Sequence, residues 1–231
     1  MLMLDHVQIT QNDFSLGANW SVPQGSRVAL IGPSGAGKST LLLAIAGFLA
    51  LTKGRILLAG QNLMPIAPGD RPLSLLFQDQ NLFPHLTIAQ NLGLGLDPAL
   101  KLTADQREKV DRTLAKVGLT GMGARKPASL SGGQQGRASL ARALLRAKPL
   151  LLLDEPFAAL GPALKAEMLD LVADVATETG ATVLMVTHDP ADAKRFAGQT
   201  VLVADGIAAA PEPTAMLFAN PPPALARYLG N

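Results

Sequence analysis

The chain lacks cysteine and has no strong excess of charge, and each shortage narrows the range of functions. Among its 231 residues there is no cysteine, so disulfide bonds and thiol chemistry are excluded and a reducing compartment suits the protein. The 20 basic and 18 acidic residues leave a net charge of +2, which is far from the basic surface of a nucleic-acid-binding protein. We therefore expect no nucleic-acid partner.

Long hydrophobic runs are also missing. The longest one, residues 41–51, is too short to cross a bilayer. Residues 1–6 contain no basic stretch followed by an apolar core, so no signal peptide is expected. Hydrophobic residues nevertheless make up 48% of the chain and charged residues only 16%, a composition that fits either a large α/β core or a surface that meets a partner. A role at a membrane would require a partner subunit.

What the chain does have is a glycine-rich loop that matches the phosphate-binding pattern G-x-x-x-x-G-K-[ST]. Its residues are Gly32, Pro33, Ser34, Gly35, Ala36, Gly37, Lys38, Ser39 and Thr40. In this pattern, backbone N–H groups and the lysine surround the phosphates of a nucleotide, and the hydroxyl after the lysine binds Mg²⁺. Glycine suits such a loop because it has no Cβ and tolerates positive φ.

The segments that flank this loop decide between a phosphate site and an ordinary flexible turn. Residues 27–31 predict a buried strand, and residues 38–49 predict a helix. A phosphate held in the loop therefore meets the N-terminus of a helix, where unpaired N–H groups and the helix dipole favour an anion. This context predicts a nucleotide site, with Lys38 reaching the β- and γ-phosphates.

The rest of the pattern is that of one α/β domain with a helical insertion. Strands are predicted at residues 3–9, 14–22, 54–58, 73–77, 150–153, 182–186 and 200–204. Helices are predicted at residues 87–96, 103–117, 131–147 and from Pro162 onward, followed by a tail with at most short helices. Thr103 and Gln106 predict a capping box, and Asp205-Gly206 predicts a hairpin turn. We expect a single domain over residues 1–231, with a core at about 1–78 and 150–231 and a helical subdomain at about 79–149.

Two acidic residues follow the strand at 150–153. Asp154 lies at the carboxyl end of that strand, where α/β sheets place their ligands, and fits a carboxylate that holds Mg²⁺ through its waters. Glu155, one residue further on, points differently and could accept a proton from an attacking water. Two adjacent acids can also simply end a strand in solvent, but the four preceding leucines and the glycine-rich loop favour the functional interpretation.

A second glycine-rich helix start occurs at residues 130–134, which read Leu-Ser-Gly-Gly-Gln. Ser131 is either a common N-cap or, together with bare N–H groups, part of a second phosphate-binding surface. One chain with two such surfaces suggests that one faces its own nucleotide and the other faces the nucleotide of a partner.

The chain resembles the ATP-binding cassette (ABC) ATPase family over essentially its whole length, through an ordered set of motifs at residues 32–39, Gln78, 130–134, 153–156 and His188. The resemblance implies an α/β fold, namely a P-loop NTPase (RecA-like) core with an N-terminal antiparallel β-subdomain and a helical signature subdomain. It implies ATP and Mg²⁺ as cofactors. It also implies that Glu155, His188 and Gln78 act in hydrolysis and that Ser39, Gln78 and Asp154 hold the metal.

The same resemblance implies a head-to-tail dimer of two copies with two ATP molecules between them. In such a dimer Ser131, Gly133 and Gln134 of one copy would contact the γ-phosphate held by the P-loop of the other. Gln78 would touch Mg²⁺ and the water while reporting to a membrane subunit, and His188 would contact the γ-phosphate. A lone histidine at that place would more often be structural, so its role rests on the resemblance.

Further stretches are similar to the ATPase subunits of bacterial thiamine importers, at residues 46–49, 76–83, 89–96 and 184–186, and this likeness implies the import of thiamine and its phosphates. This likeness implies transmembrane permease subunits docked beside residues 78–86, a periplasmic solute-binding protein as an indirect partner, and a place at the cytoplasmic face of the bacterial inner membrane. Importer ATPases for iron, sulfate or molybdate share much of the pattern, so these solutes stay open. A clamp on nucleic acid or ribosomes is disfavoured by the near-neutral charge.

Three positions depart from the family pattern. Gly161 stands where a carboxylate is usual, which puts the coupling across the dimer, and hence strong hydrolysis, in question. Gly136 lies inside a predicted helix, where glycine costs roughly 0.5–1 kcal/mol relative to alanine. No tyrosine lies near the N-terminus to stack on adenine, since the only tyrosine is Tyr228. Phe14 is the best substitute, although Phe14 and Trp20 fit the alternating strand core equally well.

Overall fold

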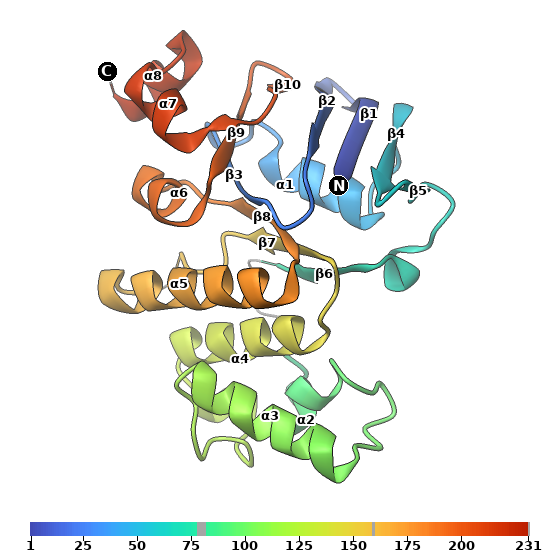
Figure 1. Cartoon of the computed structure of the whole chain (residues 1–231), viewed down its shortest axis with the longest axis vertical. Helices are drawn as coiled ribbons and strands as arrows, with labels where there is room; N and C mark the ends of the chain where they lie inside the picture. The colour runs from blue at the N-terminus through green and yellow to red at the C-terminus, as the bar shows by residue number, and fades with distance from the viewer. Residues whose placement is uncertain (78–81, 159, 231) are drawn as a thin grey trace.

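A computed structural model describes residues 1–77, 82–158 and 160–230 of the chain. Its strands form one curled sheet with an antiparallel part and a parallel part, and helices cover both faces (Figure 1). The described strands are β1 (Leu2–Gln11), β2 (Phe14–Val22), β3 (Arg27–Ile31), β4 (Lys53–Leu58), β5 (Gln61–Asn62), β6 (Leu73–Leu76), β7 (Leu150–Asp154), β8 (Thr182–Val186), β9 (Gln199–Ala204), β10 (Ile207–Ala208) and β11 (Glu212–Pro213). Each strand predicted from the sequence is present, with ends that differ by at most two residues.

The order of the strands joins the two parts of the sheet through a short connector. The sheet runs β5-β4-β1-β2-β10-β9-β3-β8-β7-β6, and β11 pairs with β9. β1, β2, β4 and β5 pair antiparallel, whereas β9, β3, β8, β7 and β6 pair parallel. The hairpin predicted at Asp205-Gly206 is confirmed, because both residues have positive φ and β10 pairs antiparallel with β9. β10 also pairs with β2, so the two parts become one sheet.

The parallel strands are buried on both faces, and this burial explains their continuous apolar sequences. Alternate residues of each strand enter two different cores. Even-numbered residues of β3, β7 and β8, such as Leu30, Leu152 and Leu184, join a core shared with the antiparallel part of the sheet. Odd-numbered residues, such as Leu151 and Val183, join a separate core under helices. A strand covered on both sides shows no polar alternation, as the run of leucines in β7 illustrates.

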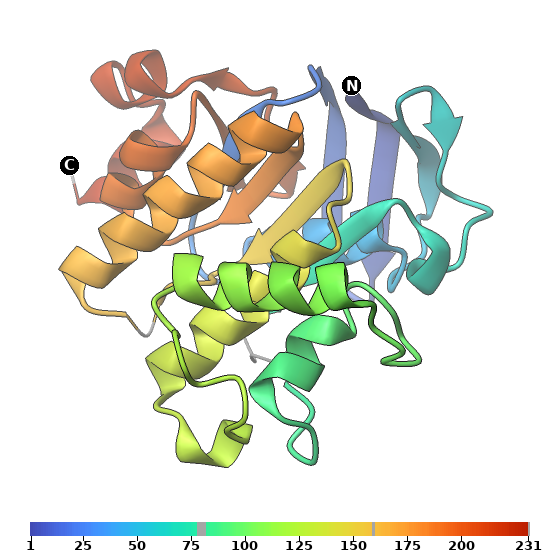
Figure 2. The same cartoon turned by 60° about the horizontal axis from the view of Figure 1, so that its bottom comes forward.

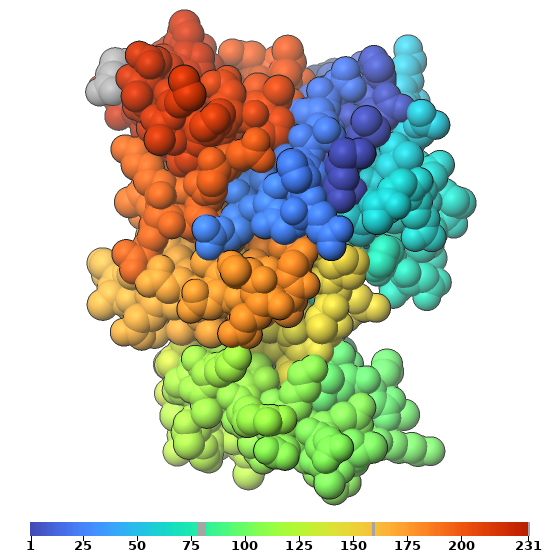
Figure 3. Space-filling view, viewed as in Figure 1, coloured from blue at the N-terminus to red at the C-terminus, as the bar shows by residue number. Residues whose placement is uncertain are grey.

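The helices are α1 (Lys38–Ala46), α2 (Ile88–Gly93), α3 (Ala104–Lys116), α4 (Gly132–Leu145), α5 (Pro162–Thr179), α6 (Pro190–Phe196), α7 (Thr214–Ala219) and α8 (Pro223–Leu229). α1 packs in the core between the two parts of the sheet, and α4, α5 and α6 cover the other face of the parallel strands. Residues of α2, α3 and α4 share a further core and form a lobe beside the sheet, drawn in green to yellow-green in Figures 2 and 3. No helix in the described part of the chain is both long enough and apolar enough to span a bilayer.

Two predicted helices are shorter in the structure, for identifiable reasons. α1 ends at Ala46 instead of Leu49 because Gly47 is left-handed and the buried Arg71 guanidinium donates to the last helical carbonyls, Ala44 O at 3.1 Å and Ile45 O at 2.6 Å. These bonds satisfy acceptors that have no partner within a helix. α2 ends at Gly93, and the chain then passes against α4 so closely that a Cβ at Gly95 would lie 2.7 Å from a backbone oxygen of α4.

Candidate functional site

The glycine-rich loop joins the end of β3 to the start of α1, and its glycines are required by shape. A Cβ at Gly32 would lie 2.0 Å from the backbone oxygen of Val203, so no larger residue fits there. Gly35 and Gly37 have φ values of 77° and 101°, which strongly favour glycine. The positive φ values expected of the pattern are therefore present, and residues of the loop line a cavity.

Lys38, the first residue of α1, is held inside this loop. Its ammonium donates to the backbone oxygens of Gly32 and Pro33, both at 2.8 Å, and the residue is only 8% exposed. Burial lowers the pKa of Lys38 below its usual value, and the nearby Glu155 and Asp154 carboxylates partly offset that shift. A buried ammonium whose hydrogen-bond acceptors, among the described residues, are neutral carbonyls is suited to an anion that brings compensating charge.

The N-terminus of α1 opens toward the same loop. Gly37 is its N-cap and provides no side-chain hydrogen bond, so the N-cap residue leaves the first-turn N–H groups uncapped. They add to the positive end of the helix dipole, which favours a phosphate. The loop, the lysine and the helix start thus meet the requirements of a phosphate site that the sequence pattern predicted.

Ser39 and Asp154 come together from positions 115 residues apart in the sequence. The Ser39 hydroxyl donates to Asp154 Oδ1 at 2.9 Å, because the carboxyl end of β7 lies two strands from that of β3 in the sheet. Burial raises the pKa of Asp154, an effect that the Ser39 hydrogen bond partly opposes. Two hard oxygen donors fit Mg²⁺, which usually takes one or two protein ligands and completes its shell with water and substrate phosphates. The third expected metal ligand, Gln78, lies outside the described residues.

Glu155 and His188 form a second pair at the same edge of the sheet. Glu155 has a positive φ of 46°, which is uncommon for a residue with a side chain, and its N–H donates to the Val186 oxygen at the end of β8. This turn separates its side chain from that of Asp154. Glu155 Oε2 then lies 3.1 Å from His188 Nδ1.

These groups surround one cavity with a volume of about 530 Å³. It is lined by Gly32, Ser34, Gly35, Gly37, Lys38, Ser39, Thr40, Glu155, His188 and Tyr228. The cavity therefore joins the phosphate loop to the predicted base and to the predicted switch histidine. The sequence did not connect Tyr228 with the site. Tyr228 and His188 are 40 residues apart, and no local sequence pattern indicates a contact over that separation.

A network of charges behind His188 was also missed. Lys165 of α5 lies 2.6 Å from Asp189 Oδ2 and 2.9 Å from Asp192 Oδ1, and Asp192 accepts a hydrogen bond from the Thr187 hydroxyl at 3.0 Å. Burial lowers the pKa of Lys165, but its hydrogen bonds to the two carboxylates outweigh burial and raise it overall. The Lys165 ammonium lowers the pKa of Asp189. Both neighbours of His188 are thus tied to α5 and α6.

Phe14 reaches the phosphate loop from β2, although it is not among the described residues that line the cavity. A Cβ at Gly37 would lie 2.6 Å from Cζ of its ring, so the ring packs directly on the loop backbone. Phe14 is partly buried and belongs to the same core as β2, whose alternating burial matches the predicted strand. Trp20 lies deeper in that core and donates from Nε1 to the Ala208 oxygen at 3.2 Å.

The second glycine-rich segment forms the start of α4 and is arranged differently. Ser131 is an exposed N-cap that accepts from the Gln134 N–H at 3.3 Å, while Gln134 Oε1 accepts from the Ser131 N–H at 2.9 Å. This capping box has the geometry predicted and found for Thr103 and Gln106 at the start of α3. None of residues 130–134, all of which are described, lines the cavity of the phosphate loop. Within one chain, the two glycine-rich segments form separate surfaces.

The positions that depart from the family pattern have clear surroundings. Gly161 is the N-cap of α5 without a side-chain hydrogen bond, and a Cβ there would meet no atom within 4 Å. The neighbouring Leu160 packs on the second glycine-rich segment, since a Cβ at Gly133 would lie 2.9 Å from its Cδ2. Gly136 is buried in α4.

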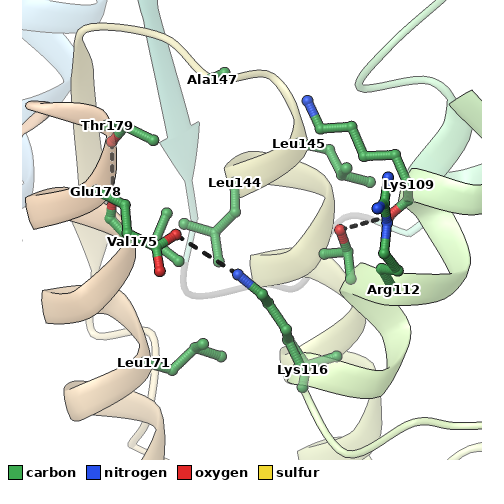
Figure 4. A pocket seen from close by; sticks show the side chains of 12 residues that line it. Lys109, Arg112, Lys116, Leu144, Leu145, Ala147, Leu171, Val175, Glu178 and Thr179 are labelled. Carbon is green, nitrogen blue, oxygen red and sulfur yellow. Dashed lines mark hydrogen bonds and ion pairs between the residues drawn. The ribbon is translucent and has the colours of Figure 1, made fainter. Parts of the chain in front are cut away.

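Two other hollows differ chemically from the phosphate loop. One, of about 460 Å³, lies between α3 and α5 and has a largely aliphatic floor that includes Leu144, Leu171 and Val175 (Figure 4). The ion pair between Lys116 and Glu178, 3.6 Å apart, crosses it. The other, of about 640 Å³, lies beside β6 and α4 and is lined by Ser74, Leu75, Leu76, Phe83, Leu94, Gly95, Leu96, Pro98, Ser139, Arg142, Ala143, Arg146 and Lys148. Neither lining includes a residue of the phosphate loop.

Sequence comparisons agree with this geometry. The profile of the ABC transporter family matches residues 16–158. The thiamine import ATP-binding protein ThiQ of Cereibacter sphaeroides is 67% identical over 230 residues, covering 100% of both chains. Its namesake from a Ruegeria species is 56% identical with the same coverage, and that of a Jannaschia species is 50% identical over 95% of this chain and 96% of its own.

Solved structures show the same fold. A dimeric post-hydrolysis state of the ATP-binding cassette MJ0796, bound to ADP and Pi, superposes with a TM-score of 0.82 at 28% identity and covers 93% of this chain and 99% of its own. A second dimeric structure of MJ0796, described as a bacterial ABC transporter cassette, gives a TM-score of 0.80 at 29% identity with the same coverage. The expected α/β fold with a P-loop NTPase core is confirmed.

Proposed function

The chain belongs to the ABC transporter family, and from that premise we propose that it is the ATP-hydrolysing subunit of a bacterial importer for thiamine. The observation that carries the proposal is that Lys38, Ser39 and the Glu155–His188 pair line one cavity, while Asp154 accepts the hydrogen bond of Ser39. Relatives that are named thiamine import ATP-binding proteins and match the full length support the solute.

The residues of this cavity divide the work of hydrolysis. The loop N–H groups and Lys38 bind and orient the β- and γ-phosphates. Ser39 and Asp154, together with Gln78 in our proposal, would hold Mg²⁺, which would supply positive charge to the transferred phosphoryl group. Glu155 accepts a proton from the attacking water, and its carboxylate is held beside the imidazole of His188. His188 contacts the γ-phosphate and keeps the base in place.

The second glycine-rich segment completes the site from another copy. Ser131 is exposed, and its hydroxyl accepts the Gln134 N–H, so the hydroxyl proton remains available to donate to a phosphate. We propose that Ser131, Gly133 and Gln134 contact the γ-phosphate of ATP held by a second copy in a head-to-tail dimer. The dimeric MJ0796 cassettes support this assembly. The core at residues 1–78 and 150–231 and the helical part at 79–149 would close on ATP as one ATPase domain.

The membrane partner is proposed to dock beside residues 78–86. The groove lined by Phe83, Arg142 and Arg146 lies at this position, and Phe83 is 47% exposed although it is large and apolar. An exposed aromatic residue beside cationic side chains is typical of a protein-binding surface. We propose that permease subunits cover it at the cytoplasmic face of the inner membrane and receive solute from a periplasmic binding protein.

Uptake in a host that lacks its own ATPase tests the proposal. We expect this chain to restore uptake of labelled thiamine in Cereibacter sphaeroides deleted for its 67%-identical relative, and Glu155→Gln to fail at equal expression. Uptake of sulfate, iron and molybdate by matched deletion strains is the control for solute. Restored uptake of sulfate, iron or molybdate without uptake of thiamine would change the assigned solute. Absence of ATPase activity in the purified chain with its permease would overturn the assignment as an ATPase.

We propose that the aromatic ring that stacks on adenine is that of Phe14. Its ring packs on Gly37, so it is positioned at the loop without lining the phosphate cavity. Phe14→Leu keeps the apolar packing and is expected to weaken ATP binding more than triphosphate binding, as measured by titration. Equal losses for both ligands would assign Phe14 to the strand core alone.

A further inference from the structure

The C-terminal helix α8 lies against the end of the sheet that carries the site. Leu225 of α8 is fully buried in a small core with Ile31, Leu202 and Leu217, so the helix is anchored to β3, β9 and α7. Ile31 immediately precedes Gly32, the first residue of the phosphate loop. The short helix is therefore fixed next to the cavity by its own apolar contacts. Figure 1 shows α8 and α7 together, near the C-terminus of the chain and beyond β9.

Tyr228 extends from this helix into the site. Its hydroxyl donates to the backbone oxygen of His188 at 2.6 Å, and the residue lines the cavity together with His188 and Glu155. Burial, together with the negative charge of Glu155 and of Asp189, raises the pKa of the Tyr228 phenol. The phenol therefore stays protonated at neutral pH and acts as a donor.

The contacts of His188 explain why such a donor matters. The His188 side chain is 60% exposed, and its Nδ1 lies 3.1 Å from the Glu155 carboxylate. The flanking residues Thr187 and Asp189 are held by the Lys165 and Asp192 network. The hydrogen bond from Tyr228 holds the carbonyl of His188 itself, between these two anchored neighbours. The position of the imidazole is then set by its own main chain as well as by the residues on either side.

We propose that Tyr228 is a positioning residue for ATP hydrolysis, which fixes the main chain of His188 so that its imidazole meets Glu155 and the bound nucleotide. This inference rests on the ATPase function proposed above. It assigns a role to a residue that lies outside the stretch matched by the family profile, residues 16–158. A tyrosine that only packed α8 onto the sheet would not need its hydroxyl, so the hydroxyl is the group to test.

Steady-state hydrolysis by the full-length chain with Mg·ATP separates these roles. Tyr228→Phe retains the ring and removes the hydrogen bond. We expect kcat to fall about three- to tenfold with KM unchanged, in line with the loss of one well-placed hydrogen bond. Arg227→Ala is the matched control on the same helix, because Arg227 is exposed and only approaches the exposed Asp205 at 3.7 Å, and it should leave kcat unchanged.

A double-variant cycle tests whether the effect passes through the histidine. In a His188→Ala background, adding Tyr228→Phe should lower the residual rate no further, because the group that Tyr228 positions is gone. A kcat for Tyr228→Phe within twofold of the original chain, or an equal loss in both backgrounds, would overturn the proposal. An original chain that binds ATP but hydrolyses none would overturn the proposed ATPase instead.

A second readout does not depend on turnover. Because Tyr228 is the only tyrosine in the chain, replacing tyrosine by 3-fluorotyrosine labels this position alone. We expect the ¹⁹F resonance of the labelled Glu155→Gln variant to shift on addition of Mg·ATP, and the shift to disappear when Lys38→Ala is added. A resonance that stays fixed while ATP is shown to bind would refute contact between Tyr228 and the working site.

Discussion

The two glycine-rich helix starts contain similar residues but are built in opposite ways. At the phosphate loop the N-cap is Gly37, which gives no side-chain hydrogen bond, and Lys38 is buried at 8% exposure. At the start of α4 the N-cap is the exposed Ser131, and its capping box with Gln134 already satisfies two N–H groups. The first segment lines a cavity together with Glu155 and His188, whereas no residue of the second segment lines that cavity.

This difference separates a region suited to binding a nucleotide from a region suited to completing the site of a second copy. The phosphate loop keeps a buried cation and uncapped N–H groups, both of which gain from an anion. The start of α4 is stable by itself, so a phosphate adds contacts to a surface that is already folded. This contrast supports our proposal that the phosphate loop binds nucleotide by itself, whereas the start of α4 acts on a nucleotide held by a second copy.

The largest effect is expected at Glu155, which belongs to the first region. Glu155→Gln removes the proton acceptor but keeps the size of the side chain, so turnover should fall about 10²–10⁴-fold while ATP binding is retained. Chromatography should show an ATP-dependent dimer that persists because hydrolysis no longer opens it. Glu167→Gln makes the same change at an exposed position of α5 and is the control. Unchanged hydrolysis in Glu155→Gln would remove Glu155 as the base.

The second region is tested by Ser131→Ala, for which the chain contains a matched control. Thr103 caps α3 with the same geometry as Ser131 caps α4. Ser131→Ala and Thr103→Ala should each lose about 1 kcal/mol of stability, or roughly 2–4 °C in Tm. Only Ser131→Ala should also lose turnover, by about 10- to 100-fold, because in our proposal Ser131, unlike Thr103, donates to a phosphate.

Nucleotide binding distinguishes the two regions further. ATP binding by dilute Ser131→Ala should equal that of the original chain, because the phosphate loop binds without a partner. Mixing Ser131→Ala with Lys38→Ala should restore activity, since their mixed dimer has one intact loop facing one intact serine. Equal turnover of the Ser131→Ala and Thr103→Ala variants would reduce Ser131 to a helix cap.

Local patterns predicted both glycine-rich segments well, because their geometry depends on neighbours in sequence. The conformation of residues 32–40 follows from glycine positions, and the capping box at Thr103 follows from residues three apart. Contacts across long separations left no such signal. Examples are the Tyr228 bond to His188 and the end of α1, which was predicted too far along the chain because Arg71 caps it from 26 residues away.

Lys165 connects the two regions and was missed for the same reason. It lies on α5, which begins just after Leu160, the residue that packs on the second glycine-rich segment. Its ammonium binds Asp189, the residue that follows His188. Lys165→Met leaves two carboxylates without their cation and should cost about 1–3 kcal/mol. Lys116→Met breaks an exposed pair with Glu178 and should cost at most about 1 kcal/mol. Thermal unfolding measures both.

The loss at Lys165 should depend on pH in a defined way. The pKa of Asp189 is lowered from its ordinary value of 3.8, so its contribution is present above that pH and is lost as pH falls through the lowered pKa. The pKa of Lys165 is raised from 10.5, so its contribution is present below that pH and is lost as pH rises through the raised pKa. The Tm difference between the original chain and Lys165→Met should stay constant between these limits. A difference that changed steadily near pH 7 would contradict the ion pair.

The smallest effect is expected at Gly161, the position where the first region of one copy would meet the second copy. A Cβ there meets no atom within 4 Å, and the residue is already an N-cap with φ −66° and ψ 158°, so aspartate fits without strain. Gly161→Asp should raise turnover about two- to fivefold by adding a charged contact across the dimer. Gly161→Asn caps α5 equally well but adds no charge, and each should gain only about a few tenths of a kcal/mol in stability. Higher turnover in Gly161→Asp alone would mean that this chain works with weakened coupling between its two regions. Equal turnover in the original chain, Gly161→Asp and Gly161→Asn would mean that the loop at 161 is not part of that coupling.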